Sequence, residues 1–84
     1  MKVVGQVNIK VEGCEYSLAV LAGREGYFYS TYGYGVDEAL IVRSIAEEGE
    51  LNHKYLEGPF NSLEELLKAC KDGQNASEVK LKLY

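Results

Sequence analysis

The sequence predicts a small α+β domain: an antiparallel sheet of about five strands, beginning with an N-terminal β-meander and covered on one face by helix. Three observations predict this fold class. They are two alternating segments near the N-terminus, an amphipathic segment with a capping sequence at 62–72, and a third alternating segment at 78–83. A chain of 84 residues suffices for one domain, which we place at 1–84.

The first two strands are predicted from the alternation of apolar and polar side chains, because successive residues of a strand point to opposite faces. Residues 2–12 place four apolar side chains on one face: Val3, Val7, Ile9 and Val11. After a tight turn at 12–15, a second strand places four more on one face: Tyr16, Leu18, Val20 and Ala22. Residues 23–26 include two glycines and predict the turn into a third strand.

The third strand is predicted from an aromatic run at 26–35, which holds four of the seven tyrosines. Alternation places Tyr27 and Tyr29 on one face, and Phe28, Tyr32 and Tyr34 on the other. We expect one of these faces to enter the core. The other is then free to present its aromatic rings to a partner.

Residues 37–48 fit two structures. As a helix capped by Asp37 and ended by Gly49, they place their apolar residues opposite Arg43 and its polar neighbours. As a strand, they mix polar and apolar side chains on both faces. Against the helix, the segment contains β-branched residues, and two glutamates lie near its C-terminal end, where the helix dipole is negative. We predict a second helix over 37–48, and a strand that lengthens the meander remains the alternative.

The clearest helix is predicted at 62–72. Ser62 and Glu65 have the spacing of a capping box, in which two side chains satisfy free backbone N–H groups at the start of a helix. The apolar residues that follow recur at the helical spacing, and Gly73 is expected to end the helix.

Two further strands complete the predicted sheet. Residues 51–57 predict a short strand that ends at Gly58-Pro59, and residues 78–83 predict the closing strand. The predicted core draws on all of these elements and consists of Val7, Ile9, Leu18, Val20, Ile45, Phe60, Leu63, Leu66, Leu67, Val79 and Leu81.

The net charge of −4 is unevenly distributed along the chain. Residues 1–35 are balanced, whereas residues 36–66 carry eight acidic and two basic side chains. An acidic surface attracts a basic protein surface and repels phosphate backbones, which argues against nucleic acid as the partner.

The sequence shows no apolar run near the roughly 18–20 residues that a bilayer requires, and its N-terminus turns polar too soon for a signal peptide. We therefore expect a cytoplasmic protein that does not bind a membrane. The two cysteines lack metal-site spacing, and we expect Cys14 to be an exposed free thiol and Cys70 a buried one.

Few residues of the sequence are suited to catalysis. The single histidine, His53, has no nucleophile motif beside it, and Gly33-Tyr34-Gly35 lacks the remaining residues of a phosphate-binding loop. The acidic residues match no calcium-loop spacing. We predict that the protein is not an enzyme and has no catalytic residues, metal or cofactor.

The segment Gly26-Tyr27-Phe28-Tyr29-Ser30-Thr31-Tyr32 resembles in outline the glycine-and-aromatic strand of the RNA-recognition motif, whose exposed rings stack on bases. The resemblance covers about ten residues, and residues 2–26 are predicted to form a hairpin where that family has a helix. It implies single-stranded nucleic-acid binding by strand 26–34 as an alternative function.

The function that these features favour is a non-enzymatic module that binds a basic protein surface. Small acidic inhibitors that occupy nucleic-acid-binding sites, including some phage proteins that block bacterial defence nucleases, share this composition. Tyrosine is enriched at interfaces and carboxylates speed association. The expected contact residues are Tyr27, Tyr29, Tyr32, Tyr34, Asp37, Glu38, Glu47, Glu48 and Glu50. A homodimer that buries an aromatic sheet face is a further alternative.

Overall fold

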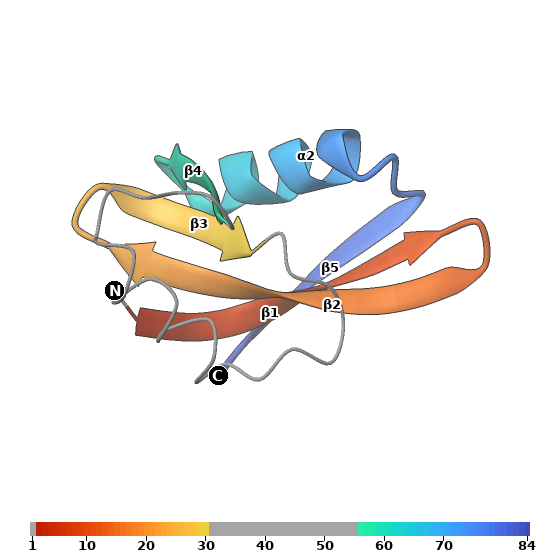
Figure 1. The fold of residues 1–84 in the computed structure, drawn as a ribbon, viewed down its shortest axis with the longest axis horizontal. Coiled ribbons are helices and arrows are strands. Elements are labelled where there is room, and N and C mark those ends of the chain that lie inside the picture. The colour runs from red at the N-terminus through yellow and green to blue at the C-terminus, as the bar shows by residue number, and fades with distance from the viewer. Residues whose placement is uncertain (1, 31–55) are drawn as a thin grey trace.

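A computed structural model of the chain describes residues 2–30 and 56–84, and it confirms the α+β fold. Five antiparallel strands form one sheet in the order β4-β3-β2-β1-β5, and a helix packs on one face (Figure 1). The elements are β1 (Lys2–Val11), β2 (Cys14–Gly23), β3 (Gly26–Ser30), β4 (Leu56–Phe60), α2 (Leu63–Gly73) and β5 (Glu78–Leu83). The predicted helix at 37–48 and the predicted core residue Ile45 lie outside the described residues.

A two-residue turn joins β1 to β2 and fixes their register. Val11 pairs with Cys14, and the residues between them, Glu12 and Gly13, have φ angles of 47° and 86°. Positive φ at both positions is the geometry of a type I′ turn, whose twist matches that of the strands it joins. The hairpin therefore has the alternation predicted from the sequence over most of its length.

A β-bulge near the start of β1 interrupts this alternation. Val3 pairs with Leu21 and Gly5 pairs with Val20, so Val4 is an extra residue on β1. Val4 packs with the cluster under the helix, whereas Val3 packs with Leu21 on the opposite face. The prediction that Val3 shares a face with Val7 is therefore wrong, because the extra residue reverses the faces beyond it.

The fourth strand continues past the position where the sequence predicted its end. Gly58 and Pro59, joined by a cis peptide bond, lie inside β4, whose last residue Phe60 pairs with Tyr27. β4 is an edge strand with a register irregularity opposite β3, and proline is tolerated at such an edge because its missing N–H removes no ladder bond. Residues 51–55 lie outside the described part of the chain.

The helix begins as predicted and ends later. Ser62 caps α2 by accepting a hydrogen bond from the Glu65 backbone N–H at 3.1 Å. The Glu65 carboxylate accepts from the backbone N–H of Asn61, also at 3.1 Å, rather than from that of Ser62. The helix runs through Gly73, and Asn75 takes the left-handed conformation beyond it with φ of 52°.

Among the described residues, no helix is long and apolar enough to cross a bilayer.

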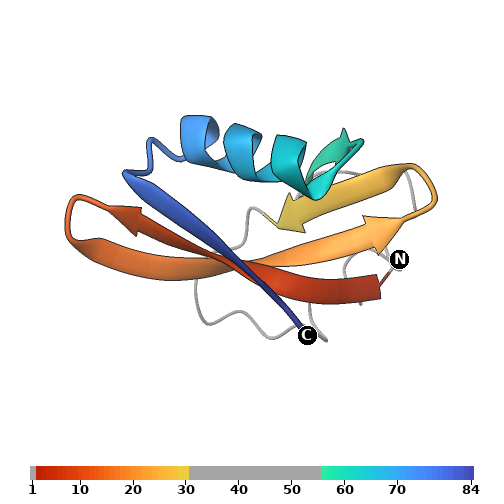
Figure 2. The ribbon, with the colours of Figure 1, turned by 180° about the vertical axis from the view of Figure 1, so that it is seen from behind.

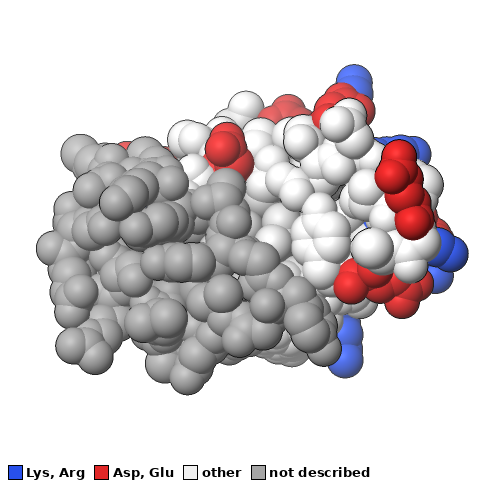
Figure 3. All heavy atoms as spheres, turned by 45° about the vertical axis from the view of Figure 1, so that its right-hand side comes forward, with Lys and Arg blue, Asp and Glu red and all other residues white. Residues whose placement is uncertain are grey.

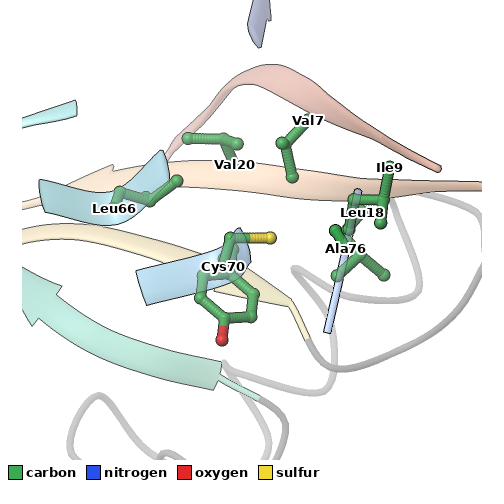
Figure 4. Packing of buried hydrophobic residues seen from close by; sticks show 8 residues of the cluster. Val7, Ile9, Leu18, Val20, Leu66, Cys70 and Ala76 are labelled. Carbon is green, nitrogen blue, oxygen red and sulfur yellow. The ribbon is translucent and has the colours of Figure 1, made fainter. Parts of the chain in front are cut away.

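The core lies between α2 and the sheet. Leu66 and Cys70 of the helix are fully buried, and in Figure 4 they lie opposite Val7 and Val20 of the sheet. The view from behind in Figure 2 shows α2 over the same face of the sheet as in Figure 1. The predicted core residues of the described ranges all belong to this cluster; the buried ones are Val7, Ile9, Leu18, Val20 and Leu66, and the partly buried ones are Phe60, Leu63, Leu67, Val79 and Leu81.

A second cluster lies on the face of the sheet opposite α2. It contains Leu21, Phe28 and Leu56, with exposed fractions of 5% or less. Phe28 of β3 therefore points into this cluster while its neighbour Tyr29 points into the cluster under the helix. The expectation that one face of the aromatic strand is free is wrong for Phe28 and Tyr29, which are buried on opposite faces of β3, whereas Tyr27 is half-buried.

We predict that Leu66→Ala lowers the free energy of unfolding by about 2–5 kcal/mol, because it removes a fully buried side chain and leaves a cavity. Urea denaturation measures this loss. The exposed neighbour Lys68 provides the control, and Lys68→Ala should change stability by about 0.5 kcal/mol or less. Similar effects of the two substitutions would contradict the packing of α2 on the sheet.

Candidate functional site

Tyr29, one of the predicted contact residues, is buried under the helix. Its exposed fraction is 4%, and its ring stacks on that of Phe60 with centroids 5.9 Å apart and an interplanar angle of 1°. Burial is the main cause that raises the pKa of Tyr29, and the nearby Cys70 and Glu57 raise it further. A hydrogen bond to Gln74 acts in the opposite direction and lowers it. Tyr29 is a core residue of the described structure, so its ring is not part of an exposed surface.

Tyr27 is the other predicted contact residue within the described ranges. It is half-buried and packs against the cluster under the helix, on the same face of β3 as Tyr29. The structure thus brings two of the nine predicted contact residues together. The others lie outside the described residues: Tyr32, Tyr34, Asp37, Glu38, Glu47, Glu48 and Glu50.

A polar cluster at the C-terminal end of α2 was not predicted. The Tyr16 hydroxyl donates to Gln74 Oε1 at 2.7 Å. A Cβ on Gly73 would lie 3.2 Å from the Tyr29 hydroxyl, so glycine at this position leaves room for the tyrosine. Burial, with Cys70 nearby, raises the pKa of Tyr16. The cluster anchors the end of the helix over β2 and β3, and no local pattern predicts it, because Tyr16 and Gln74 are 58 residues apart in the sequence.

The two cysteines lie in opposite environments, as predicted. Cys14 is exposed next to the β1–β2 turn, and Cys70 is fully buried in the cluster under the helix. Burial raises the pKa of the Cys70 thiol to about 11. Because the thiolate is the reactive form, Cys70 has the properties of a structural residue rather than a nucleophile.

The face of the sheet opposite α2 is polar over β5 and over the parts of β1 and β2 nearest to their connecting turn. Asn8 pairs with Ser17 on one side and Lys80 on the other, and the Ser17 hydroxyl donates to Asn8 Oδ1 at 2.6 Å. Gln6 Nε2 donates to the same Asn8 oxygen at 2.7 Å. Lys10 lies between Glu15 and Glu78 in the register of the strands. This surface consists of cross-strand polar and charged pairs, as the alternation of β1 and β5 predicted.

An open hollow of about 430 Å³ lies over this polar part of the sheet. Its lining combines lysines, carboxylates, an amide and a hydroxyl: Asn8, Ile9, Lys10, Glu15, Tyr16, Ser17, Glu78 and Lys80. In Figure 3, acidic and basic side chains are interspersed along the margin of the described residues around a largely uncharged centre. Within residues 2–30 and 56–84, no three His, Cys, Asp or Glu side chains are grouped so that they could hold a metal ion.

The structure fixes the two ends of the segment that holds most of the predicted contact residues. Ser30 at the end of β3 pairs with Leu56 at the start of β4, and their exposed fractions are 0% and 5%. The segment between them holds five acidic and two basic residues, and thus three of the four net negative charges of the chain. The described residues form a nearly neutral sheet and helix that hold the ends of this acidic segment side by side.

No protein-family model, curated protein or solved structure matches this chain.

We predict that the two thiols differ strongly in reactivity. A chromogenic disulfide reagent, followed by absorbance, should modify Cys14 of the folded protein rapidly and Cys70 only after a denaturant is added. The Cys14→Ser variant isolates the buried thiol and should remain unmodified while folded. Rapid modification of that variant in buffer would show that Cys70 is accessible.

We also predict that stability falls as the pH rises from about 9 to about 11. The unfolded thiol ionises near its ordinary pKa of 9.0, whereas folded Cys70 stays protonated until about 11, so its contribution is complete below pH 9 and is lost through that interval. Urea melts should show a loss on the order of 2 kcal/mol from this group. The Cys70→Ala variant should have a smaller loss, and an unchanged loss in that variant would contradict the assignment.

Proposed function

We propose that the protein is a non-enzymatic, acidic protein-binding module that attaches to a basic protein surface and inhibits its partner. A nucleic-acid-binding protein, such as a nuclease of bacterial defence blocked by a phage inhibitor, is the class of partner that this chemistry suits. Such a partner has a basic surface that an acidic module can cover.

The observation that carries this proposal is the position of the acidic segment between two paired strands. Ser30 and Leu56 are buried neighbours, so the sheet holds the ends of a segment in which the negative charge is concentrated. Segments carried between the elements of a rigid scaffold are common sites of recognition in proteins. The acidic residues of the proposed contact are Asp37, Glu38, Glu47, Glu48 and Glu50.

The proposed contact contains fewer tyrosines than the sequence predicted. Since Tyr29 is stacked in the core, it is left out of the contact. Tyr27, Tyr32 and Tyr34 remain in it. Tyrosines at the centre of an interface supply most of the affinity, whereas carboxylates at its rim mainly increase the association rate.

The burial of β3 also favours a protein partner over single-stranded nucleic acid. Base stacking requires an exposed ring face. Phe28 and Tyr29 are 1% and 4% exposed, so neither of these two rings offers such a face, and Tyr27, the third aromatic residue of β3, is half-buried. Cations and carboxylates alternate on the polar face of the sheet, and this pattern does not suit a phosphate backbone.

The proposal predicts different kinetic effects for the aromatic and the acidic residues. A partner captured from the source organism or its host is purified, and its binding is measured by surface plasmon resonance. Tyr32→Ala and Tyr34→Ala should each raise the dissociation rate about tenfold or more. The triple variant Glu47→Gln, Glu48→Gln, Glu50→Gln should slow association and reduce its salt dependence.

The control triple variant carries the same change in charge on exposed scaffold residues: Glu12→Gln, Glu25→Gln and Glu64→Gln. Association of this variant should be closer to that of the unmodified protein. If the two triple variants associate equally fast and the tyrosine substitutions leave dissociation unchanged, the proposed contact is wrong.

A further inference from the structure

β5 forms one edge of the sheet, and in the described part of the chain no strand pairs with its outer side. The direction of its backbone groups follows from the ladder with β1. The Tyr84 N–H donates to the Val4 carbonyl at 3.0 Å, and in an antiparallel ladder the hydrogen-bonded pairs alternate. Gln6–Lys82 and Asn8–Lys80 are therefore also hydrogen-bonded pairs.

The intervening residues of β5 point their backbone groups away from β1. These residues are Val79, Leu81 and Leu83, and each presents an N–H and a C=O to the outer side of the strand. The β1–β2 turn supports this assignment, because the Val11–Cys14 pair next to a two-residue turn directs the odd-numbered residues of β1 toward β2. Such an edge can accept a further strand.

Charged and apolar side chains alternate along β5. Val79 and Leu81 pack against the cluster under the helix, and Leu83 is 54% exposed. The opposite face carries Glu78, Lys80 and Lys82. Lys80 Nζ lies 3.4 Å from Glu78 Oε1 on the same strand.

We propose that β5 pairs antiparallel with β5 of a second copy of this chain, with Lys80 next to the two-fold axis. Val79 then forms hydrogen-bonded pairs with Leu81 of the partner subunit, and Leu81 with the partner's Val79. Glu78 lies opposite the partner's Lys82, and this pair occurs twice because of the symmetry. The sheet becomes continuous through both copies, with the two α2 helices on the same face.

Charge and existing backbone hydrogen bonds together select this register over two alternatives. A register centred on Leu81 places Lys80 opposite the partner's Lys82 twice, and like charges directly opposite destabilise a sheet. A register centred on Val79 extends beyond the start of β5 to Ser77, whose backbone N–H already donates to the Lys10 carbonyl at 2.9 Å. The register centred on Lys80 keeps two opposite-charge pairs and one Lys80–Lys80 contact, whose repulsion the adjacent Glu78 carboxylates reduce.

Charge reversal tests both the dimer and its register. Sedimentation equilibrium of the full chain, from micromolar to millimolar concentration, should show a weak dimer, since an edge-to-edge contact buries a small area. Glu78→Lys and Lys82→Glu should each weaken it about tenfold or more, because each places like charges opposite one another twice. An equimolar mixture of the two variants should form a heterodimer nearly as stable as the original dimer, because every reversed pair is again of opposite charge.

Matched controls carry the same charge changes on exposed positions of α2. Glu64→Lys and Lys68→Glu should each leave the dimer within about twofold of the original. Urea melts of all variants verify that they are folded. A chain that is monomeric at millimolar concentration, single reversals that dimerise normally, or a mixture that stays monomeric would each overturn the proposal.

Discussion

The β4–α2–β5 crossover is the constraint on which the rest of the structure depends. β4 and β5 lie at opposite edges of the sheet, so α2 must pass over all three inner strands to join them. In Figures 1 and 2 the helix runs roughly along β1 and β2 rather than at right angles to them. Its apolar stripe contributes Leu63, Leu66, Leu67 and Cys70 to the cluster between helix and sheet.

This constraint separates the two faces of the molecule. The face under α2 is filled by side chains from every strand and closed at the far end of the helix by Tyr16, Tyr29 and Gln74. The thiol of Cys70 lies inside it and is held protonated. The other face is apolar around β3, β4 and the adjoining parts of β2 and β1, and it is polar over β5 and near the β1–β2 turn. The outer edge of β5, proposed for pairing between two copies, lies at the margin of the sheet rather than on the packed face.

Much of the fold could be predicted from the sequence because its signals are local. Alternation in β1, β2 and β5 and the Ser62 cap of α2 depend on neighbouring residues alone. The bulge at Val4 could not be predicted, because adjacent valines fit either face and the pairing with β2 decides between them. Tyr29 was placed in the candidate site for a similar reason. An aromatic run shows the same pattern whether its rings face solvent or a helix, and the stacking partner Phe60 comes from a strand that was predicted to end before it.

The position of β1 in the sheet has a consequence for the order of folding. β1 pairs with β2 across a two-residue turn, but with β5 through residues as distant as Gly5 and Leu83. The entropy lost in closing a loop increases with its length, so local hairpins form earlier than remote pairings. The meander β1–β2–β3 can therefore form first and serve as the surface on which α2 condenses. We expect β5 to join after the meander has formed, and until it does β1 is itself an open edge.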